Sequence, residues 1–406
     1  MDLRARATRE IREYIAVIYN RNVALLLLSF PLIVAPMGFL SWYSPVFTDE
    51  LFHSWAPLLY ALFLLDDALF LSISGVLSDM WGRRIILVIG MLFYPLGMFL
   101  VLLGLTLGNS ILIALGLILA LGISSLASPA GTSLLMESLE VERRARALSL
   151  FFLIENIFLL TGSSLFGLLL PALGVHQVFL IFFLLSAVAV LIRAQVRETL
   201  VLSDKIKLRD RIAELRSIIS ILKDARVKLL IAFDALLGIS HGTIAFVVPL
   251  FFAHDIHLSE VEIGFLYGLI PALRIFLSPI AGTISEHHMH ASIAIGTTIT
   301  GLLYLSLLAP LGKLSAIIGI TGSALTLFEG IAYSKLVSTI VQGRGMASLY
   351  GFTGTVFSLG MGLGSYLLGS TYYWRSWFPI AIASFLLIFS PILIPRSKEN
   401  SDNSSL

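Results

Sequence analysis

Apolar residues fall into twelve long runs along the chain, and short polar segments separate the runs. A helix needs about 20 mostly apolar residues to cross a membrane, and each run is close to that length. The pattern therefore predicts twelve transmembrane helices. They cover residues 22–47, 55–78, 85–107, 110–136, 147–170, 176–196, 228–252, 261–285, 291–311, 313–336, 346–370 and 376–395.

The composition supports an all-α integral membrane protein and argues against several other classes. Hydrophobic residues make up 57% of the chain and charged residues 13%, whereas soluble domains carry about 25% charged residues. The chain has no cysteine, which excludes disulfides and thiolate metal sites. A net charge of +2 without a long basic tract gives no support for nucleic-acid binding. We expect a lipid bilayer around the protein and neither a metal nor a cofactor within it.

Positive charges set the expected orientation. All but three of the 27 Lys and Arg residues face the cytosol if both termini lie there. The exceptions are Arg274 inside a run and Lys313 and Arg375 in outer loops. An excess of Lys and Arg marks the cytosolic side of membrane proteins. The bias therefore predicts a multi-pass plasma-membrane protein with both termini in the cytosol.

The longest polar interruption divides the twelve runs into six and six. It predicts an N-terminal half over residues 1–196, a cytosolic linker over 197–227 and a C-terminal half over 228–406. Apolar residues recur at helical spacing between Asp204 and Arg226, which indicates an amphipathic helix on the membrane surface. Residues 3–19 are interpreted in the same way.

The two halves also resemble each other in sequence. Residues 72–79 read SISGVLSD, and residues 279–286 read PIAGTISE. Parallel six-helix repeats of this kind are typical of one group of secondary transporters, in which solute binds between the repeats. The repeat therefore favours transport by alternating access.

One segment carries a family resemblance. Residues 75–84, GVLSDMWGRR, closely resemble the G-x-L-x-D-x-x-G-R-R signature of the major facilitator superfamily, at the cytosolic end of the second helix. Residues 128–144 and Arg197-Glu-Thr-Leu200 resemble its helix 4–5 passage and the segment after its sixth helix. The resemblance covers almost the whole chain and implies that family's twelve-helix fold in two six-helix pseudo-repeats. It also implies a cytosolic gate that locks the outward-facing state, formed by Gly75, Asp79, Gly82, Arg83 and Arg84.

Elementary stereochemistry gives these positions a physical reason. We expect Gly75 to permit a close helix contact, Gly82 to adopt a positive φ, and Asp79 to pair with Arg83 or Arg84. The alternative is a turn whose arginines only fix the topology. In the second half, EHHMH at residues 286–290 replaces the arginines. That segment is interpreted as a weakened second latch, with a metal site or a plain loop as alternatives.

Ionisable residues inside the spans are the candidates for proton coupling. An acid at the centre of a membrane helix costs about 2.5–3.5 kcal/mol on insertion scales. Asp66 and Asp67 lie together at the middle of the second span, and neighbours on a helix diverge by about 100°. We therefore predict that only one of the two faces the cavity and carries the coupling proton. The further candidates are Asp234, Glu155 and Glu329.

A second set of residues is predicted to line the substrate cavity. Its members are polar or aromatic side chains inside the spans, namely Asn156, His241, Arg274, Thr326 and Tyr333. Each also has a structural interpretation, as a hydrogen-bond partner between helices or a packed residue. The predicted spans contain five acids and only one arginine, so protons or a cationic solute must compensate the excess negative charge.

These observations favour a secondary transporter that exports a small organic solute by proton antiport and acts as a monomer. Uptake of a sugar or organic acid by symport or uniport is the alternative, because the patterns of drug antiporters and sugar porters are both incomplete. A sensor or receptor on the same fold is the alternative from another class. The sequence contains no P-loop and no catalytic pairing, so we expect neither ATP-driven transport nor an enzyme.

Overall fold

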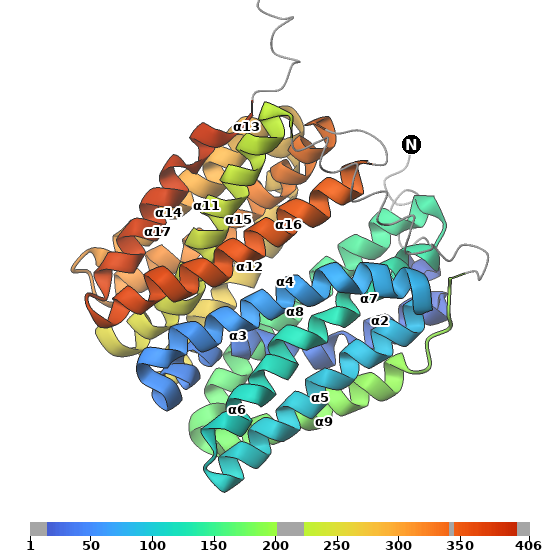
Figure 1. Ribbon diagram of the computed structural model, residues 1–406, viewed down its shortest axis with the longest axis horizontal. Helices are drawn as coiled ribbons and strands as arrows, with labels where there is room; N and C mark the ends of the chain where they lie inside the picture. The colour runs from blue at the N-terminus through green and yellow to red at the C-terminus, as the bar shows by residue number, and fades with distance from the viewer. Residues whose placement is uncertain (1–13, 201–222, 341–344, 396–406) are drawn as a thin grey trace, which may run out of the picture. The chain divides into compact units, whose positions relative to one another are not determined.

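The computed structural model describes residues 14–200, 223–340 and 345–395, and within these ranges the chain is helical without any strand (Figure 1). The regular helices are α2 (Arg21–Ser29), α3 (Pro31–Phe52), α4 (Ala56–Trp81), α5 (Arg83–Leu107), α6 (Ser110–Leu117), α7 (Ala127–Glu137), α8 (Val141–Leu173), α9 (Val175–Arg193), α11 (Ala225–Leu250), α12 (Glu260–His287), α13 (Met289–Ala294), α14 (Thr300–Leu305), α15 (Lys313–Ile340), α16 (Gly345–Leu363) and α17 (Trp377–Phe389).

Short 3₁₀- and π-helical segments connect or interrupt these helices. They are η1 (His53–Trp55), η2 (Ile118–Gly122), η3 (Ile123–Leu126), η5 (Phe251–Asp255), η6 (Ile295–Ile299), η7 (Ser306–Leu308), η8 (Gly364–Leu368), η9 (Gly369–Tyr373) and η10 (Ser390–Leu393). Several lie inside predicted spans, so the regular α-helix is interrupted there.

The helices account for the predicted membrane spans. Among the described residues, 9 helical runs are long and apolar enough to cross a membrane. The first run, Arg21–Trp81, is 61 residues long and holds two spans. With α16 and the shorter apolar run Trp377–Leu393 added, the described helices supply twelve spans. The predicted all-α membrane architecture is confirmed.

Two predicted spans contain breaks that the apolar pattern does not reveal. The first span divides at Phe30 into α2 and α3, because Pro31 has no N–H to continue the helical hydrogen bonds. The fourth span contains a π-turn and a 3₁₀-turn between α6 and α7. There the Ser74 hydroxyl of α4 donates a 2.5 Å hydrogen bond to the Leu126 carbonyl oxygen.

The turn between α5 and α6 shows how local sequence ends these helices. Gly108 closes α5 in the left-handed region, with φ at 63° and its N–H bonded to the Gly104 carbonyl. Asn109 then begins α6, because its side chain accepts hydrogen bonds from the N–H groups of Ile111 and Leu112. A glycine after one helix and an asparagine before the next are the preferred capping residues.

Contacts divide the chain into two units. The first unit comprises Met1–Phe39 and Leu69–Leu208, and the second comprises Leu40–Ala68 and Arg209–Leu406. The second unit thus joins the end of α3 and the start of α4 to the last six spans. The predicted domain boundaries at residues 196 and 228 stay a prediction, and so does the amphipathic helix at 204–226, most of which lies outside the described residues.

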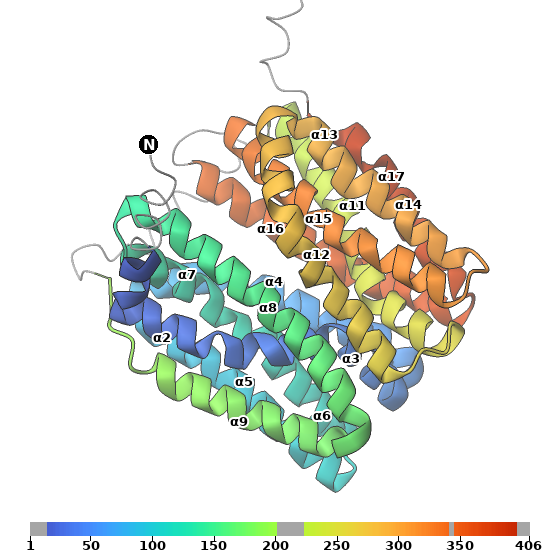
Figure 2. The same ribbon diagram turned by 180° about the vertical axis from the view of Figure 1, so that it is seen from behind.

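Small residues allow close helix packing in the first unit. A Cβ atom on Gly38 would meet the backbone of Leu159, and one on Gly162 would meet the backbone of Ala35. These contacts hold α3 against α8 at backbone distance, as small residues do in membrane helices. On the other side of this unit, α9 runs beside α5 and α2 (Figure 2).

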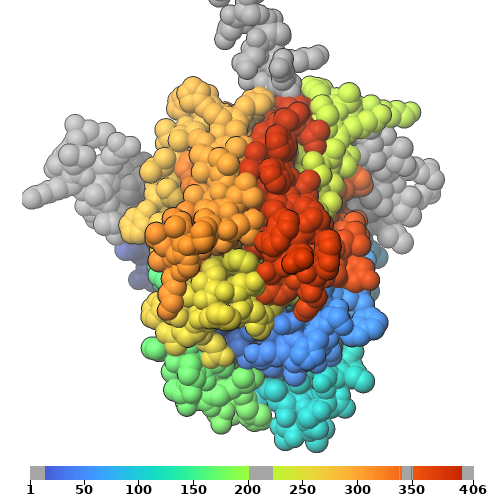
Figure 3. Space-filling model, turned by 90° about the vertical axis from the view of Figure 1, so that its left-hand side faces the viewer, coloured from blue at the N-terminus to red at the C-terminus, as the bar shows by residue number. Residues whose placement is uncertain are grey.

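The second unit uses the same device around α11. Gly238 and Gly242 of α11 lie against the backbones of Phe357 and Met361 in α16. Helix α12 packs along α15, and α14 packs against both α15 and α17. Figure 3 shows α17 in red beside the segment around α14 in orange, on one face of this unit.

Large apolar side chains cover the outside of both units. Leu28 of α2 and Phe276 of α12 are 63% and 75% exposed. A protein surrounded by water rarely shows so much contiguous apolar surface, whereas lipid tails solvate it without cost. The chain is therefore a multi-pass membrane protein.

Candidate functional site

The turn between α4 and α5 requires a glycine. Gly82 has φ at 121°, a conformation that residues with a Cβ rarely adopt. A Cβ at this position would also lie 2.5 Å from an oxygen of the Glu198 carboxylate. Gly82 therefore serves both the reversal of the chain and the approach of Glu198, and the expected positive φ is present.

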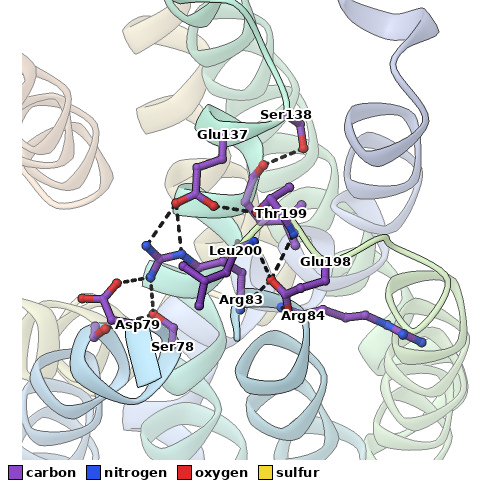
Figure 4. A network of polar contacts seen from close by, with 11 residues as sticks. Ser78, Asp79, Arg83, Arg84, Glu137, Ser138, Glu198, Thr199 and Leu200 are labelled. Carbon is purple, nitrogen blue, oxygen red and sulfur yellow. Dashed lines mark hydrogen bonds and ion pairs between the residues drawn. The ribbon is translucent and has the colours of Figure 1, made fainter. Parts of the chain in front are cut away.

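Arg83 binds two carboxylates at this turn (Figure 4). Its Nη1 forms an ion pair with Asp79 and donates a 2.9 Å hydrogen bond to Ser78. Its Nε and Nη2 donate to Glu137 Oε1 at 3.1 Å and 3.0 Å. Glu137 ends α7, so the arginine ties the end of the second span to the end of the fourth.

Glu198 organises the other side of the same turn. Its two carboxylate oxygens accept hydrogen bonds from the backbone N–H groups of Arg83 and Arg84, at 3.0 Å and 3.1 Å. These are the first N–H groups of α5, which have no partner within the helix and attract negative charge. Arg84 donates instead to the Ala194 carbonyl at 2.8 Å. Asp79 therefore pairs with Arg83 and not with Arg84.

The segment after α9 is fastened to this cluster. The Thr199 hydroxyl donates a 2.6 Å hydrogen bond to Glu137 Oε2. The backbone N–H of Arg197 donates to Asn22 Oδ1 at 2.9 Å, and Asn22 Nδ2 donates to the Ser138 hydroxyl at 2.9 Å. The cluster thus joins the ends of the second, fourth and sixth spans.

In the part of the chain that the structure describes, Gly75 lacks the expected close helix contact, and two histidines of the second repeat contact backbone carbonyls. Among the described residues no atom lies within 4 Å of the place a Cβ would take at Gly75, so the expected close helix contact is not found there. In the second repeat, His287 Nδ1 contacts the Thr283 carbonyl at 3.0 Å and His290 Nε2 the Pro395 carbonyl at 3.3 Å. The role of this segment as a weakened latch stays a prediction.

Inside the second unit, Asp234 of α11 pairs with Tyr333 of α15. The Tyr333 hydroxyl donates a 2.6 Å hydrogen bond to Asp234 Oδ2, and Asp234 is only 3% exposed. The tyrosine ring stacks on Phe233 with centroids 6.2 Å apart. A predicted coupling acid and a predicted cavity residue are thus direct partners.

Arg274 and Glu329 lie along the same part of α15. Arg274 Nη2 donates to the Ser323 carbonyl at 3.0 Å and to Thr326 Oγ1 at 2.9 Å. Glu329 follows Thr326 by three residues, about one helical turn, and is 9% exposed. It lies where Gly296 of η6 meets the α15 backbone. Helix α15 therefore holds the Arg274 guanidinium at Thr326 and a buried acid, Glu329, one turn further on.

The remaining candidates are dispersed. The His241 ring packs against Phe357 at a tilt, with centroids 5.6 Å apart, and its Nδ1 lies 2.9 Å from the Leu237 carbonyl. Asn156 of α8 is 2% exposed, and within the described residues no donor reaches its Oδ1. Its neighbour Glu155 is partly exposed, as are Asp66 and Asp67 of α4.

Several residues that the structure brings together had no predicted role. Glu137, Glu198 and Thr199 were part of the weaker family motifs, and the spacing of those motifs was the available signal. A second polar cluster, around Asp49, could not be predicted from any motif, because its members are isolated polar residues near the ends of apolar runs.

The spans and the ionic cluster at the end of the second span agree with the transporter family that residues 75–84 resemble. The family model of the Major Facilitator Superfamily matches residues 24–365, and the chain belongs to this family. No curated protein sequence matches the chain. The predicted family is confirmed.

Solved structures of other transporters share the fold. The human organic anion transporter MFSD10 (TETRAN) has a TM-score of 0.64 and 14% identity over 92% of this chain and 99% of its own. The nucleoside transporter NupG has a TM-score of 0.70 and 14% identity over 91% and 97%. A peptide transporter POT in complex with sulfate has a TM-score of 0.69 and 12% identity over 91% and 93%.

Proposed function

We propose that the chain exports a small organic solute across the plasma membrane in exchange for protons, with both termini in the cytosol. The observation that carries the proposal is the buried Asp234–Tyr333 pair. The fold supports alternating access, and the burial of this acid supports coupling to protons. The 3% exposure of Asp234 leaves its carboxyl group almost no contact with water.

A buried carboxyl group must be neutral or compensated. The Tyr333 hydroxyl is a neutral donor, so it offsets only part of the cost of removing a carboxylate from water. Glu329 adds a second buried acid nearby, while Arg274 supplies one positive charge. Asp234 therefore keeps a proton in this state and releases it when its surroundings become hydrated. An acid of this kind exchanges protons with whichever side of the membrane is open.

Antiport follows if proton and solute exclude each other at this site. A proton bound from the outer side is released to the cytosol, and a solute then occupies the deprotonated site and travels outward. The cluster of Asp79, Arg83 and Glu137 acts in this scheme as the cytosolic gate. Its three charged groups are held together by ion pairs that water must separate before the gate opens.

The test compares two substitutions at one hydrogen bond. Asp234→Asn removes the titrating group, whereas Tyr333→Phe removes the hydroxyl and keeps the ring that stacks on Phe233. Liposomes with and without a pH gradient are assayed with ethidium, uridine, glucose and benzoate as probes. We expect Asn at 234 to abolish gradient-driven flux while exchange without a gradient persists. Phe at 333 should retain coupling and shift its pH profile.

Two results would contradict the proposal. Gradient-driven flux that survives in Asp234→Asn would place the proton site elsewhere. Net movement of the probe into the compartment that corresponds to the cytosol would contradict export. In the experiment the direction is read by imposing the gradient in each sense with the same probe. Purified protein that binds none of the four probes is screened with further solutes by thermal stabilisation.

One observation favours a second candidate function, the uptake of an organic acid by symport. Arg274 and the Thr326 hydroxyl form a cationic site with hydrogen-bonding capacity, and an arginine is well suited to hold a carboxylate. Benzoate distinguishes the two candidates. Symport predicts accumulation of benzoate toward the alkaline side and loss of that accumulation in Arg274→Gln.

A further inference from the structure

A polar cluster surrounds Asp49 near the end of α3. Asp49 is 8% exposed, and both of its carboxylate oxygens are bound. Oδ2 lies 3.1 Å from His254 Nε2, and Oδ1 accepts a hydrogen bond from the Tyr373 hydroxyl. Three segments that are distant in sequence, α3, η5 and η9, therefore meet at one carboxylate.

The next residues form a parallel set of contacts. Asp255 accepts hydrogen bonds from the Tyr372 hydroxyl at 2.8 Å and from the Ser376 hydroxyl at 2.5 Å. The rings of Tyr372 and Tyr373 pack edge to face with centroids 5.8 Å apart. The second set of contacts ties η5 to η9, and it thereby holds Tyr373 in position to reach Asp49.

The turn between α3 and α4 is held by the same tyrosine. The Tyr373 hydroxyl also lies 2.8 Å from the His53 carbonyl oxygen. His53 has φ at 46°, in the left-handed region that a residue with a Cβ enters only at a cost. The contact with Tyr373 is one of the interactions that offset this cost.

Apolar contacts continue from this cluster along α4. The rings of Tyr60 and Phe246 lie 5.5 Å apart, and the Leu65 side chain fills the place that a Cβ would take at Gly362. The first half of α4 is thus attached to α11 and α16 over about one and a half helical turns. The polar cluster stands at the end of this attachment.

The position of the cluster decides what it does in transport. Asp49 and His53 lie where the first span connects to the second, whereas His254 and Tyr373 follow the seventh and eleventh. Asp49 precedes the start of α4, and the Asp79–Arg83 cluster stands at the end of that helix, so the two clusters lie at opposite ends of one span. If the two six-span halves rock, as the proposed function requires, contacts between their ends must break in every cycle.

We infer that Asp49, Tyr373 and His254 form the latch of the outer gate, and that the strength of this latch sets how often the transporter opens outward. The inference rests on alternating access and not on the identity of the solute. Hydrogen bonds suit such a latch, since water replaces each of them when the gate opens.

The test measures how often the outer end opens. Thr48 is fully buried beside Asp49, and the chain has no cysteine, so Thr48→Cys gives a single reporter for an impermeant maleimide. Tyr373→Phe removes the hydroxyl contacts with Asp49 and His53 but keeps the ring. We expect the labelling rate to rise about tenfold or more, because a hydrogen bond to a charged group is lost.

A matched control removes an ion pair at the same end of the molecule. Glu262 pairs with Lys313, and both residues belong to the last six spans, so rocking does not break that pair. Glu262→Gln should leave the labelling rate unchanged. Asp49→Asn should raise it, and the Asp49→Asn, Tyr373→Phe double variant should raise it at least as much as either single variant, because it also loses the contact with His53.

Equal labelling rates in Tyr373→Phe, Asp49→Asn and the parent protein would overturn the latch. A similar rise in Glu262→Gln would also overturn it, because the change would then reflect general loosening. Gradient-driven flux is measured on the same preparations. Flux that remains coupled while labelling does not change disproves the latch alone, whereas loss of coupling in the parent protein disproves the proposed function.

Discussion

The hydroxyl of Thr199 donates to the same carboxylate of Glu137 that holds Arg83. Thr199 follows the sixth span, Glu137 ends α7, and Arg83 begins α5. The beginning of the segment that connects the two sequence halves is therefore bonded to the gate motif itself. Because of this bond, a movement of residues 197–200 would displace the Glu137 carboxylate that binds Arg83.

The first prediction concerns the charge of Asp79. Asp79→Asn removes the negative partner at Arg83 Nη1 but leaves Glu137 bound to Nε and Nη2. We expect the cytosolic end to open more easily, by about 1.5–3 kcal/mol for one hydrogen bond to a charged group. Transport should fall and the accessibility of cysteines beside the gate should rise, with expression near normal. Thr199→Val, which removes a neutral donor from Glu137, should give a smaller change in the same direction.

The second prediction separates two glycines inside helices. A Cβ at Gly238 of α11 would collide with the backbone of Phe357, whereas at Gly282 of α12 nothing in the described residues lies within 4 Å. Overpacking of this kind costs about 1–3 kcal/mol, so Gly238→Ala should lower the thermal unfolding midpoint. Gly282→Ala should leave it unchanged or raise it slightly, since alanine favours a helix. Equal effects of the two substitutions would contradict the packing described for α11 and α16.

The twelve spans could be predicted because each is a long apolar run, and the runs are visible without knowledge of the contacts. The break at Pro31 follows from a known property of proline, yet its effect on the first span was hidden by apolar residues on both sides. The gate turn was predictable as well, since Gly82 and Arg83 belong to a recognisable motif. Local sequence thus reports helices and turns.

Contacts between distant segments carry no such report. Tyr373 and Asp49 are separated by 324 residues, and neither belongs to a repeat or a motif. The pairing of Asp234 with Tyr333 spans 99 residues. In the sequence, both tyrosines look like ordinary membrane-interface or packing residues. Only the arrangement of the helices shows which polar side chains become partners.

The third prediction tests the predicted orientation. Lys223 and Leu311 are both exposed, and the charge bias places the first in the cytosol and the second outside. Single cysteines at these positions should label differently in intact cells, with an impermeant maleimide reaching position 311 only. Permeabilised cells should label both positions and provide the control for reactivity. Labelling of position 223 alone would reverse the topology.

The fourth prediction concerns the adjacent acids of α4. Asp66 and Asp67 are both partly exposed, and about 100° of helix rotation separates them. If one of them contributes a coupling proton, its Asn variant should lose gradient-driven flux and keep exchange. The Asn variant of the other should change thermal stability or expression instead. Full gradient-driven flux in both variants would leave Asp234, Glu155 and Glu329 as the candidate coupling acids.

The last prediction concerns the contribution of His254 to the outer latch. Burial and the adjacent carboxylates of Asp255 and Asp49 raise the pKa of Tyr372 and of Tyr373, respectively. Both phenols therefore remain protonated donors in the physiological range. His254 supplies the other contact of the cluster, through its Nε2 at 3.1 Å from Asp49 Oδ2.

Two acids lie beside His254. Asp49 lies 3.1 Å from its Nε2, and Glu50 interacts with it electrostatically. His254→Ala removes the imidazole contact with Asp49 and leaves the Tyr373 hydroxyl in place, so one of the two contacts that hold this carboxylate is lost. The Thr48→Cys reporter should therefore label faster in His254→Ala than in the parent protein, after correction for the reactivity of the maleimide measured on Leu311→Cys. His254→Gln keeps a hydrogen-bond donor and should label more slowly than His254→Ala. Equal labelling rates in His254→Ala and the parent protein would show that Asp49 and Tyr373 hold the latch without His254.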